Sequence, residues 1–346
     1  MYQVEIDKVI RKWYKDIMFN YQKICLDLLK DLPQKQKEII LRRFALSTLA
    51  SGEGGIKRAT LESIGRDFGI TRERVRQIEE DGLEKVKQKN NKYQKIFQYF
   101  KKHLKKFGDL RKEELLLGEL GGKIWQNQIY FLLNLDPVFK RYGESDDFYS
   151  LWLTNPSSLR KAKEILNSLH KKLGEIKKPL ALKEISAFFS LNNYVLESFL
   201  EISQKIQKNK EGFYGLKDWP EIHPKGVKDM AYLVFKKVKG PLHFTKVAKL
   251  IEGSLVQTVH NELIRDSRFV LVGRGVYALK EWGYEPGQVK DIILKVLKET
   301  GPQSKEKILE EVLKQRLVKE NTILLNLSNR KYFLRDSQGK YLVREA

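Results

Sequence analysis

Four closely spaced polar residues carry the chemical groups best suited to reading a nucleic acid: Arg72, Glu73, Arg76 and Gln77. On a helix, at about 100° per residue, they share the face opposite Val75 and Ile78. Arginine and glutamine can make paired hydrogen bonds to purine edges in a major groove, and glutamate accepts from cytosine. The spacing predicts a base-reading helix, with an ordinary exposed helix stabilised by charge pairs as the alternative.

The elements that must position these side chains form a predicted helix-turn-helix over residues 60–80. Thr60 and Thr71 are expected to cap the N-termini of its two helices. Gly69 suits the left-handed conformation that ends a helix tightly. The apolar residues expected to form the core between the helices are Leu61, Ile64, Phe68, Ile70, Val75 and Ile78.

The segments 32–44, 60–65 and 69–79 resemble region 4 of sigma-70-type sigma factors, and the run TRERVRQIE at 71–79 is the most specific part. The resemblance covers residues 31–88. It implies a domain that reads the −35 promoter element and docks on the flap of the RNA polymerase β subunit. By this resemblance the four polar residues read bases. The residues expected at the DNA backbone are Arg43, Thr60, Leu61, Thr71 and Arg74.

Two departures from the family pattern limit the resemblance. Asp81 and Glu84 stand where the family carries basic residues after its recognition helix. The 30 residues before the resemblance are too few for the family's region 2, which binds the polymerase clamp and melts the −10 element. Residues 4–30 instead have the apolar spacing of one amphipathic helix. We therefore expect a promoter-reading protein that lacks a melting region.

Beyond residue 90, two sequence landmarks recur about every 64 residues, which indicates a repeat. The first is an aromatic strand that contains Tyr149, Tyr214, Tyr277 and Tyr341. The second is a Pro-Leu or related step at 178–185, 240–247 and 301–308, with a weaker copy at 108–111. The predicted domains are the helix of residues 1–30, a head at 31–90, and units at 91–154, 155–222, 223–284 and 285–346.

Each predicted unit has three helices followed by two short strands. In the third unit the helices are expected at 225–239, 244–251 and 254–265, and the strands at 269–272 and 276–279. This order is the winged-helix plan. The predicted fold class is therefore mainly α: a helix-turn-helix head followed by four tandem winged-helix units, each with a small β-wing.

The third unit also resembles a known domain. The segments GPLHF at 240–244, RDSRF at 265–269 and VGRGVYAL at 272–279 resemble the HARE-type winged helix, over residues 224–284. That domain occurs in the δ subunit of bacterial RNA polymerase, and it implies association with DNA or polymerase. We expect Arg274 at the wing tip to enter a minor groove or to hold a phosphate. Gln257, His260 and Asn261 either face DNA or are merely solvated.

Composition agrees with a polyanionic partner, double-stranded DNA, because the formal net charge is +22. Cys25 is the only cysteine, the five histidines lack metal-ligand spacing, and no phosphate-binding loop is present. We expect a protein that is not an enzyme and has no metal, cofactor or small-molecule substrate. No signal peptide or apolar membrane span is evident, so a cytoplasmic, nucleoid-associated protein is expected.

The leading interpretation is a sigma-factor-like regulator that reads a promoter site and contacts RNA polymerase. One alternative is a polymerase accessory subunit of the δ type that binds DNA without sequence preference. The other is the DNA-binding adaptor of a restriction-type system. The target sequence, the direction of regulation and the oligomeric state do not follow from the residues.

Overall fold

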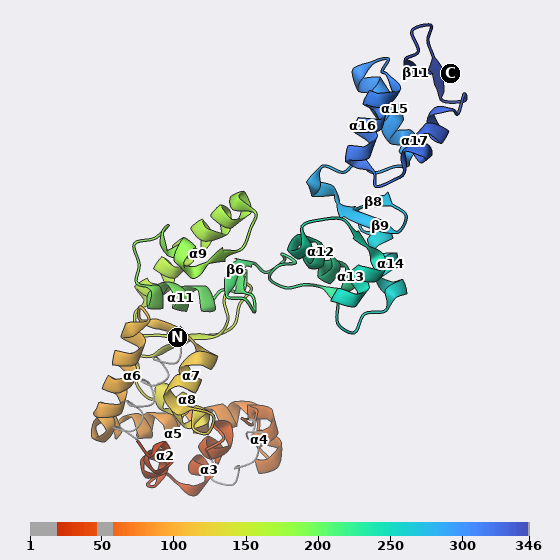
Figure 1. Ribbon diagram of the computed structural model, residues 1–346. Helices are drawn as coiled ribbons and strands as arrows, with labels where there is room; N and C mark the ends of the chain where they lie inside the picture. Colours follow the sequence, from red (N-terminus) through yellow and green to blue (C-terminus); the bar gives the residue numbers. More distant parts are fainter. Residues whose placement is uncertain (1–18, 47–57, 345–346) are drawn as a thin grey trace. The chain divides into compact units, whose positions relative to one another are not determined.

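The structure is a computed structural model that describes residues 19–46 and 58–344 (Figure 1). The chain divides into two compact parts, Met1–Lys217 and Asp218–Ala346. Helices predominate, and the sheets are small and antiparallel. Among the described residues, no helix has both the length and the apolar character needed to cross a membrane.

The first part begins with four helices: α2 (Tyr21–Leu29), α3 (Gln34–Arg43), α4 (Leu61–Phe68) and α5 (Arg72–Lys87). The prediction of one unbroken helix over 4–30 is wrong, because Phe19 and Asn20 are not helical. The side chain of Asn20 accepts the backbone N–H of Lys23 at 2.9 Å, so it caps the N-terminus of α2, as asparagine favours. Residues 1–18 and the glycine-rich loop at 51–55 lie outside the described residues.

The hydrophobic core of the head continues past residue 90. After the 3₁₀ turn Asn90–Tyr93 come α6 (Gln94–Lys106), α7 (Glu113–Gly121) and α8 (Gln126–Leu133). One cluster of buried side chains joins these helices to the head, including Leu28, Phe44, Phe100, Phe131 and Trp152. Burial of each such side chain contributes about 1.5–3 kcal/mol. The apolar stripe of α2 therefore packs on the following helices, and the expected boundary at residue 90 does not divide the core.

Three successive stretches of the chain share one order of elements, namely a helix, a short strand, two helices and two strands, and a fourth has the same order without the short strand. We call them stretch 1 (91–154), stretch 2 (155–222), stretch 3 (223–284) and stretch 4 (285–346). The strands of stretch 1 are β1 (Leu110–Lys112), β2 (Lys140–Tyr142) and β3 (Leu151–Leu153). Stretch 2 comprises α9 (Pro156–Ile176), β4 (Leu180–Ala181), α10 (Leu182–Ser186), α11 (Asn193–Glu201), β5 (Ile206–Lys208) and β6 (Phe213–Leu216).

The second compact part contains stretches 3 and 4 (Figure 1). Stretch 3 comprises α12 (Gly226–Val238), β7 (Leu242–His243), α13 (Phe244–Leu250), α14 (Val256–Arg265), β8 (Phe269–Gly273), β9 (Val276–Leu279) and a 3₁₀ turn (Lys280–Trp282). Stretch 4 comprises α15 (Val289–Thr300), α16 (Lys305–Gln315), α17 (Glu320–Leu327), β10 (Phe333–Arg335) and β11 (Tyr341–Val343). In stretch 4 an isolated bridge at Gln303 replaces the short strand.

The two sequence landmarks meet in the sheets, which explains their common period. The Pro-Leu step forms a strand that pairs with the aromatic strand. The paired residues are Leu180 with Tyr214, Leu242 with Tyr277, and Gln303 with Tyr341. The final strand lies in the middle of each three-stranded sheet, since the orders are β1-β3-β2, β4-β6-β5 and β7-β9-β8.

The first copy of the aromatic strand lies later than predicted. A strand was expected at 148–152, but β3 begins at Leu151, and Leu110 pairs with Leu153. Phe148 instead forms a bridge with Ser203 of stretch 2, and the Tyr149 N–H donates to the Ile202 carbonyl at 2.9 Å. The backbone at Phe148 and Tyr149 is therefore hydrogen-bonded to stretch 2 rather than to the sheet of stretch 1.

Candidate nucleic-acid interface

The corner between α4 and α5 is built by local capping. The Thr60 hydroxyl accepts the Ser63 N–H at 3.1 Å, and the Thr71 hydroxyl accepts the Arg74 N–H at 3.2 Å. Gly69 ends α4 with a φ of 62°, a conformation that glycine adopts without strain. Both predicted caps and the predicted helix end are confirmed.

A second glycine allows the corner to close. The Ile70 N–H donates to the Gly65 carbonyl at 2.9 Å, and a β-carbon on Gly65 would lie 2.7 Å from the Ile70 carbonyl oxygen. Beneath the corner, Ile39, Ile64 and Val75 are fully buried. The predicted core residues Leu61, Phe68, Ile70 and Ile78 are partly buried around them. The corner is thus a tight turn on a small apolar core.

The outward face of α5 carries the four predicted base readers, and all four are exposed (Arg72, Glu73, Arg76 and Gln77). Glu73 accepts two hydrogen bonds from Arg76, at 2.9 and 2.7 Å, and Glu80 pairs with the same guanidinium. The hydrogen bond from Arg76 lowers the pKa of Glu73, and Glu73 raises the pKa of Arg76. An exposed pair adds little stability, but it holds both side chains charged and oriented.

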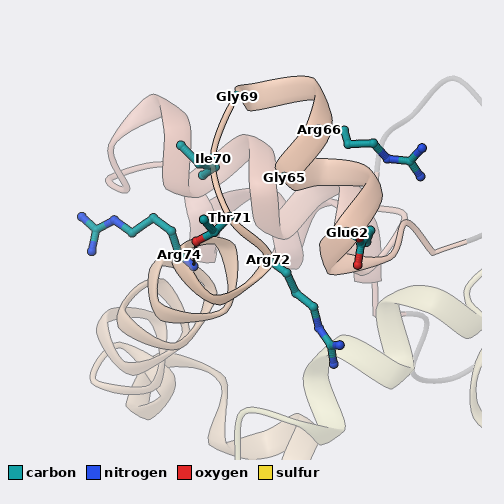
Figure 2. Close-up of a pocket in the computed structure, with 8 residues that line it drawn as sticks. All are labelled: Glu62, Gly65, Arg66, Gly69, Ile70, Thr71, Arg72 and Arg74. Atoms are coloured by element: carbon teal, nitrogen blue, oxygen red, sulfur yellow. Dashed lines mark hydrogen bonds between the residues drawn. The ribbon is translucent and has the colours of Figure 1, made fainter.

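Three arginines surround a shallow hollow at the corner (Figure 2). The hollow is lined by Glu62, Gly65, Arg66, Gly69, Ile70, Thr71, Arg72 and Arg74. The arginine side chains extend from it in different directions (Figure 2). Arg74 donates to the Gln77 amide oxygen at 3.1 Å, whereas Arg66 and Arg72 form no hydrogen bond or ion pair with residues that the structure describes. The corner therefore offers two uncommitted guanidinium groups to an anionic ligand.

Arg66 was not among the predicted site residues, although the sequence contains a signal for it. It lies four residues after Glu62, on the outward side of the first helix, and one turn before Gly69. A helix-turn-helix brings this part of its first helix close to the start of the second. Reading the outward face of α4 as well as that of α5 would have found it.

Two of the residues predicted to contact the DNA backbone, Arg43 and Leu61, have side-chain partners within the head. Arg43 donates to Glu79 at 3.0 Å and to the Ala59 carbonyl at 2.6 Å, so it braces α3 against α5 and the segment that leads into α4. The Leu61 side chain packs into the small core, while Thr60 and Thr71 are exposed. At Leu61 only the main chain at the start of α4 is placed to contact a phosphate.

Arg58 is a further positioning residue that the sequence did not indicate. Its guanidinium carbon lies 3.5 Å from the centre of the Tyr130 ring, and its Nε donates to the Asn127 side chain at 3.3 Å. Both partners lie on α8, so the residues just before α4 are held against stretch 1. The two sides of this contact lie far apart in sequence, and no local pattern indicates it.

The predicted site residues of stretch 3 fall into two groups. Arg274 is exposed in the turn between β8 and β9, and Gln257 donates to Asn261 at 3.1 Å on the exposed side of α14. His260 differs, since its ring stacks on Phe244 with centroids 4.2 Å apart. Packing occupies one face of that ring, so it is not a simple solvated side chain.

A comparison with known families bears on the head alone. The model of the family described as Sigma-70, region 4 matches residues 28–88, which contain α3, α4 and α5 and the whole exposed face of α5. That region is a helix-turn-helix DNA-binding domain of sigma factors, and it is regulatory rather than catalytic. Residues 28–88 are therefore similar to a DNA-binding domain of the transcription machinery.

Proposed function

We propose that this chain is a sequence-specific DNA-binding transcription regulator that reads a −35-like promoter element with α5 and contacts RNA polymerase. The observation that carries the proposal is the exposed face of α5 at 72–77, presented by a capped helix-turn-helix inside the segment similar to sigma-70 region 4. A helix of this kind lies in the major groove with its N-terminal residues against the bases.

Within that face the residues have different tasks. Arg72 and Gln77 are proposed to contact bases directly, because each can make paired hydrogen bonds to a purine. Arg76 is proposed to contact a base while Glu73 fixes its orientation, since the two are already paired at 2.7 Å. The corner groups Arg66, Arg74, Thr60 and Thr71 would hold phosphates, together with the main-chain N–H groups at the start of each helix.

We further propose that stretches 1 to 4 are winged-helix domains, with stretch 3 of the HARE type, and that the head comprises residues 31–90. Their recurring element order and their basic first helices support this assignment. Such domains would add sequence-independent phosphate contacts, in stretch 3 through Arg274 in the turn between β8 and β9. His260 is left out of the contact set because Phe244 covers its ring.

The test is selection of bound sequences from random duplex DNA, with the purified full-length chain at physiological salt. Low salt must be avoided, because a net charge of +22 binds any duplex. An enriched motif that resembles a −35 element is expected. Binding without enrichment that disappears as salt rises would contradict the proposal.

The net charge of +22 also favours a second candidate, an accessory subunit of RNA polymerase that binds DNA without sequence preference. That function predicts co-purification with the polymerase and no enriched motif. Both candidates place the protein in the cytoplasm with the nucleoid, and labelling of the intact protein in cells would test this location.

A further inference from the structure

Stretch 3 contains a second helix-turn-helix corner, formed by α13, residues 251–255 and α14, and this corner is apolar. Leu250 is 52% exposed, Leu255 74% and Val256 45%. Ile264, further along α14, is 63% exposed. Apolar side chains gathered on a surface mark interaction sites more often than single exposed ones do. The shape and charge of this corner indicate the kind of partner that it fits.

The corner is held in a fixed shape. The Ser254 hydroxyl donates to the carbonyls of Ala248 at 3.2 Å and Ile251 at 3.0 Å, and Gly253 adopts a φ of 73°. Below the turn, His260 stacks on Phe244 and links α14 to α13. Leu255 and Val256 are thus presented by a tight turn, which reduces the ordering cost of binding.

The corner does not have the chemistry of a phosphate-binding surface. From Ile251 to Ile264 the chain contains no lysine or arginine, and its charged residues are Glu252 and Glu262. DNA affinity depends on cations that replace the counterions of the phosphates. Leucine at the tip of the turn supplies none, so a duplex is a poor occupant of this corner.

Two cations on α13 define the partner more closely. Lys246 is one helical turn before Leu250, so the two are neighbours on the helix surface, and Lys249, next to Leu250 in the sequence, is exposed as well. Neither lysine forms an ion pair with residues that the structure describes. Acidic groups beside an apolar face would therefore complement the surface. A second copy of the chain would not, since each carries +22.

We infer that the apolar corner of stretch 3 (Leu250, Leu255 and Val256, flanked by Lys246 and Lys249) docks an amphipathic helix of another protein that carries acidic residues beside its apolar face. Laying an apolar helix face on a preformed surface is a common mode of peptide recognition. This binding does not depend on DNA reading by α5, so either activity can exist without the other.

The test uses a display library of random short peptides, selected against the immobilised full-length chain. Enriched peptides are expected to have apolar residues at helical spacing and a net negative charge. Fluorescence anisotropy of the enriched peptides should show binding weakened about tenfold or more by Leu255→Ser, since the change removes an apolar side chain that the bound helix would bury. Lys246→Glu/Lys249→Glu should weaken it as well.

Leu325→Ser is the matched control, because Leu325 lies on α17 and is 73% exposed, close to the 74% of Leu255. Peptide binding should survive this change and also Arg72→Ala/Gln77→Ala in the head. The inference is overturned if no peptide is enriched, if the enriched peptides lack this pattern, or if Leu325→Ser weakens binding as much as Leu255→Ser. It is also overturned if duplex DNA competes with the peptides, or if Leu255→Ser dissolves a dimer seen by sedimentation.

Discussion

The chain contains two corners between successive helices, α4–α5 and α13–α14, and their surfaces differ. In both, a glycine with positive φ follows the first helix, Gly69 at 62° and Gly253 at 73°. The α4–α5 corner is surrounded by arginines, whereas the α13–α14 corner exposes leucine and valine. Each corner has a positive-φ glycine before its second helix, so the difference between them lies in the exposed side chains, which are cationic in one and apolar in the other.

The largest expected effect is on DNA affinity at the α4–α5 corner, which we call the cationic corner because arginines surround it. Arg72→Ala/Gln77→Ala should remove two side chains that we propose contact bases, and a paired hydrogen bond of this kind discriminates against a wrong base by about 1–3 kcal/mol. Affinity for the selected motif should therefore fall by about a hundredfold or more, while affinity for random duplex falls far less. Titration of both duplexes by anisotropy measures the difference. An equal loss on both would show that these residues hold only phosphates.

A side chain at Gly65, where α4 approaches the main chain of Ile70 closely, should lower the free energy of unfolding. In Gly65→Ala the new methyl would meet the Ile70 carbonyl at 2.7 Å, a main-chain group that cannot rotate away. Overpacking of this kind costs about 1–3 kcal/mol, more than alanine gains in a helix. Hydrogen exchange of α4 and α5 amides in increasing urea would report the loss. Gly118→Ala on α7, which meets open space, should instead be neutral or stabilising.

The apolar corner is closed by a hydroxyl, so its corresponding variant should be milder. Ser254→Ala removes the hydrogen bonds to Ala248 and Ile251, and an intramolecular hydrogen bond contributes about 1 kcal/mol. Faster exchange of α13 and α14 amides is expected, with α4 and α5 unchanged. Ser328→Ala, which removes an exposed hydrogen bond at the end of α17, is the control and should change little.

The smallest effect concerns salt dependence, and it separates the two corners directly. Arg66→Ala should reduce the slope of log affinity against log salt by about 0.9, the value for one phosphate contact. Leu255→Arg adds a cation to the apolar corner, which we place away from DNA, so the slope should not change. An increase of similar size in that variant would place both corners on the duplex.

Local features were predicted well from sequence because neighbouring residues determine them. Thr60, Thr71 and Gly69 act within one turn of their own helices, and the alternation of apolar and polar residues on α5 fixes its exposed face. The shared period of the two landmarks has a different cause, since the short strand and the aromatic strand are distant in sequence but hydrogen-bonded neighbours in one sheet.

The errors have long-range causes. Phe148 and Tyr149 have the composition of a strand, yet their backbones pair with stretch 2. Arg58 is positioned by Tyr130, and Arg43 is engaged by Glu79, contacts that no periodicity indicates. Which arginines remain free for a ligand depends on such partners, so the sequence predicted the exposed face of α5 better than the contacts of the arginines around it.

The helices α2 and α3 share one hydrophobic core with α6, α7 and α8. This core limits how the segment similar to sigma-70 region 4 can be transferred to another protein. Excision of residues 28–88, the segment that the family model matches, would remove the ring contact of Phe44 with Phe131. It would also remove the contact of Arg58 with Tyr130. A graft onto another protein would need to carry the chain at least through β3, because Trp152 belongs to the same core. The segment similar to sigma-70 region 4 and stretch 1 therefore form one structural unit that has to be transferred together.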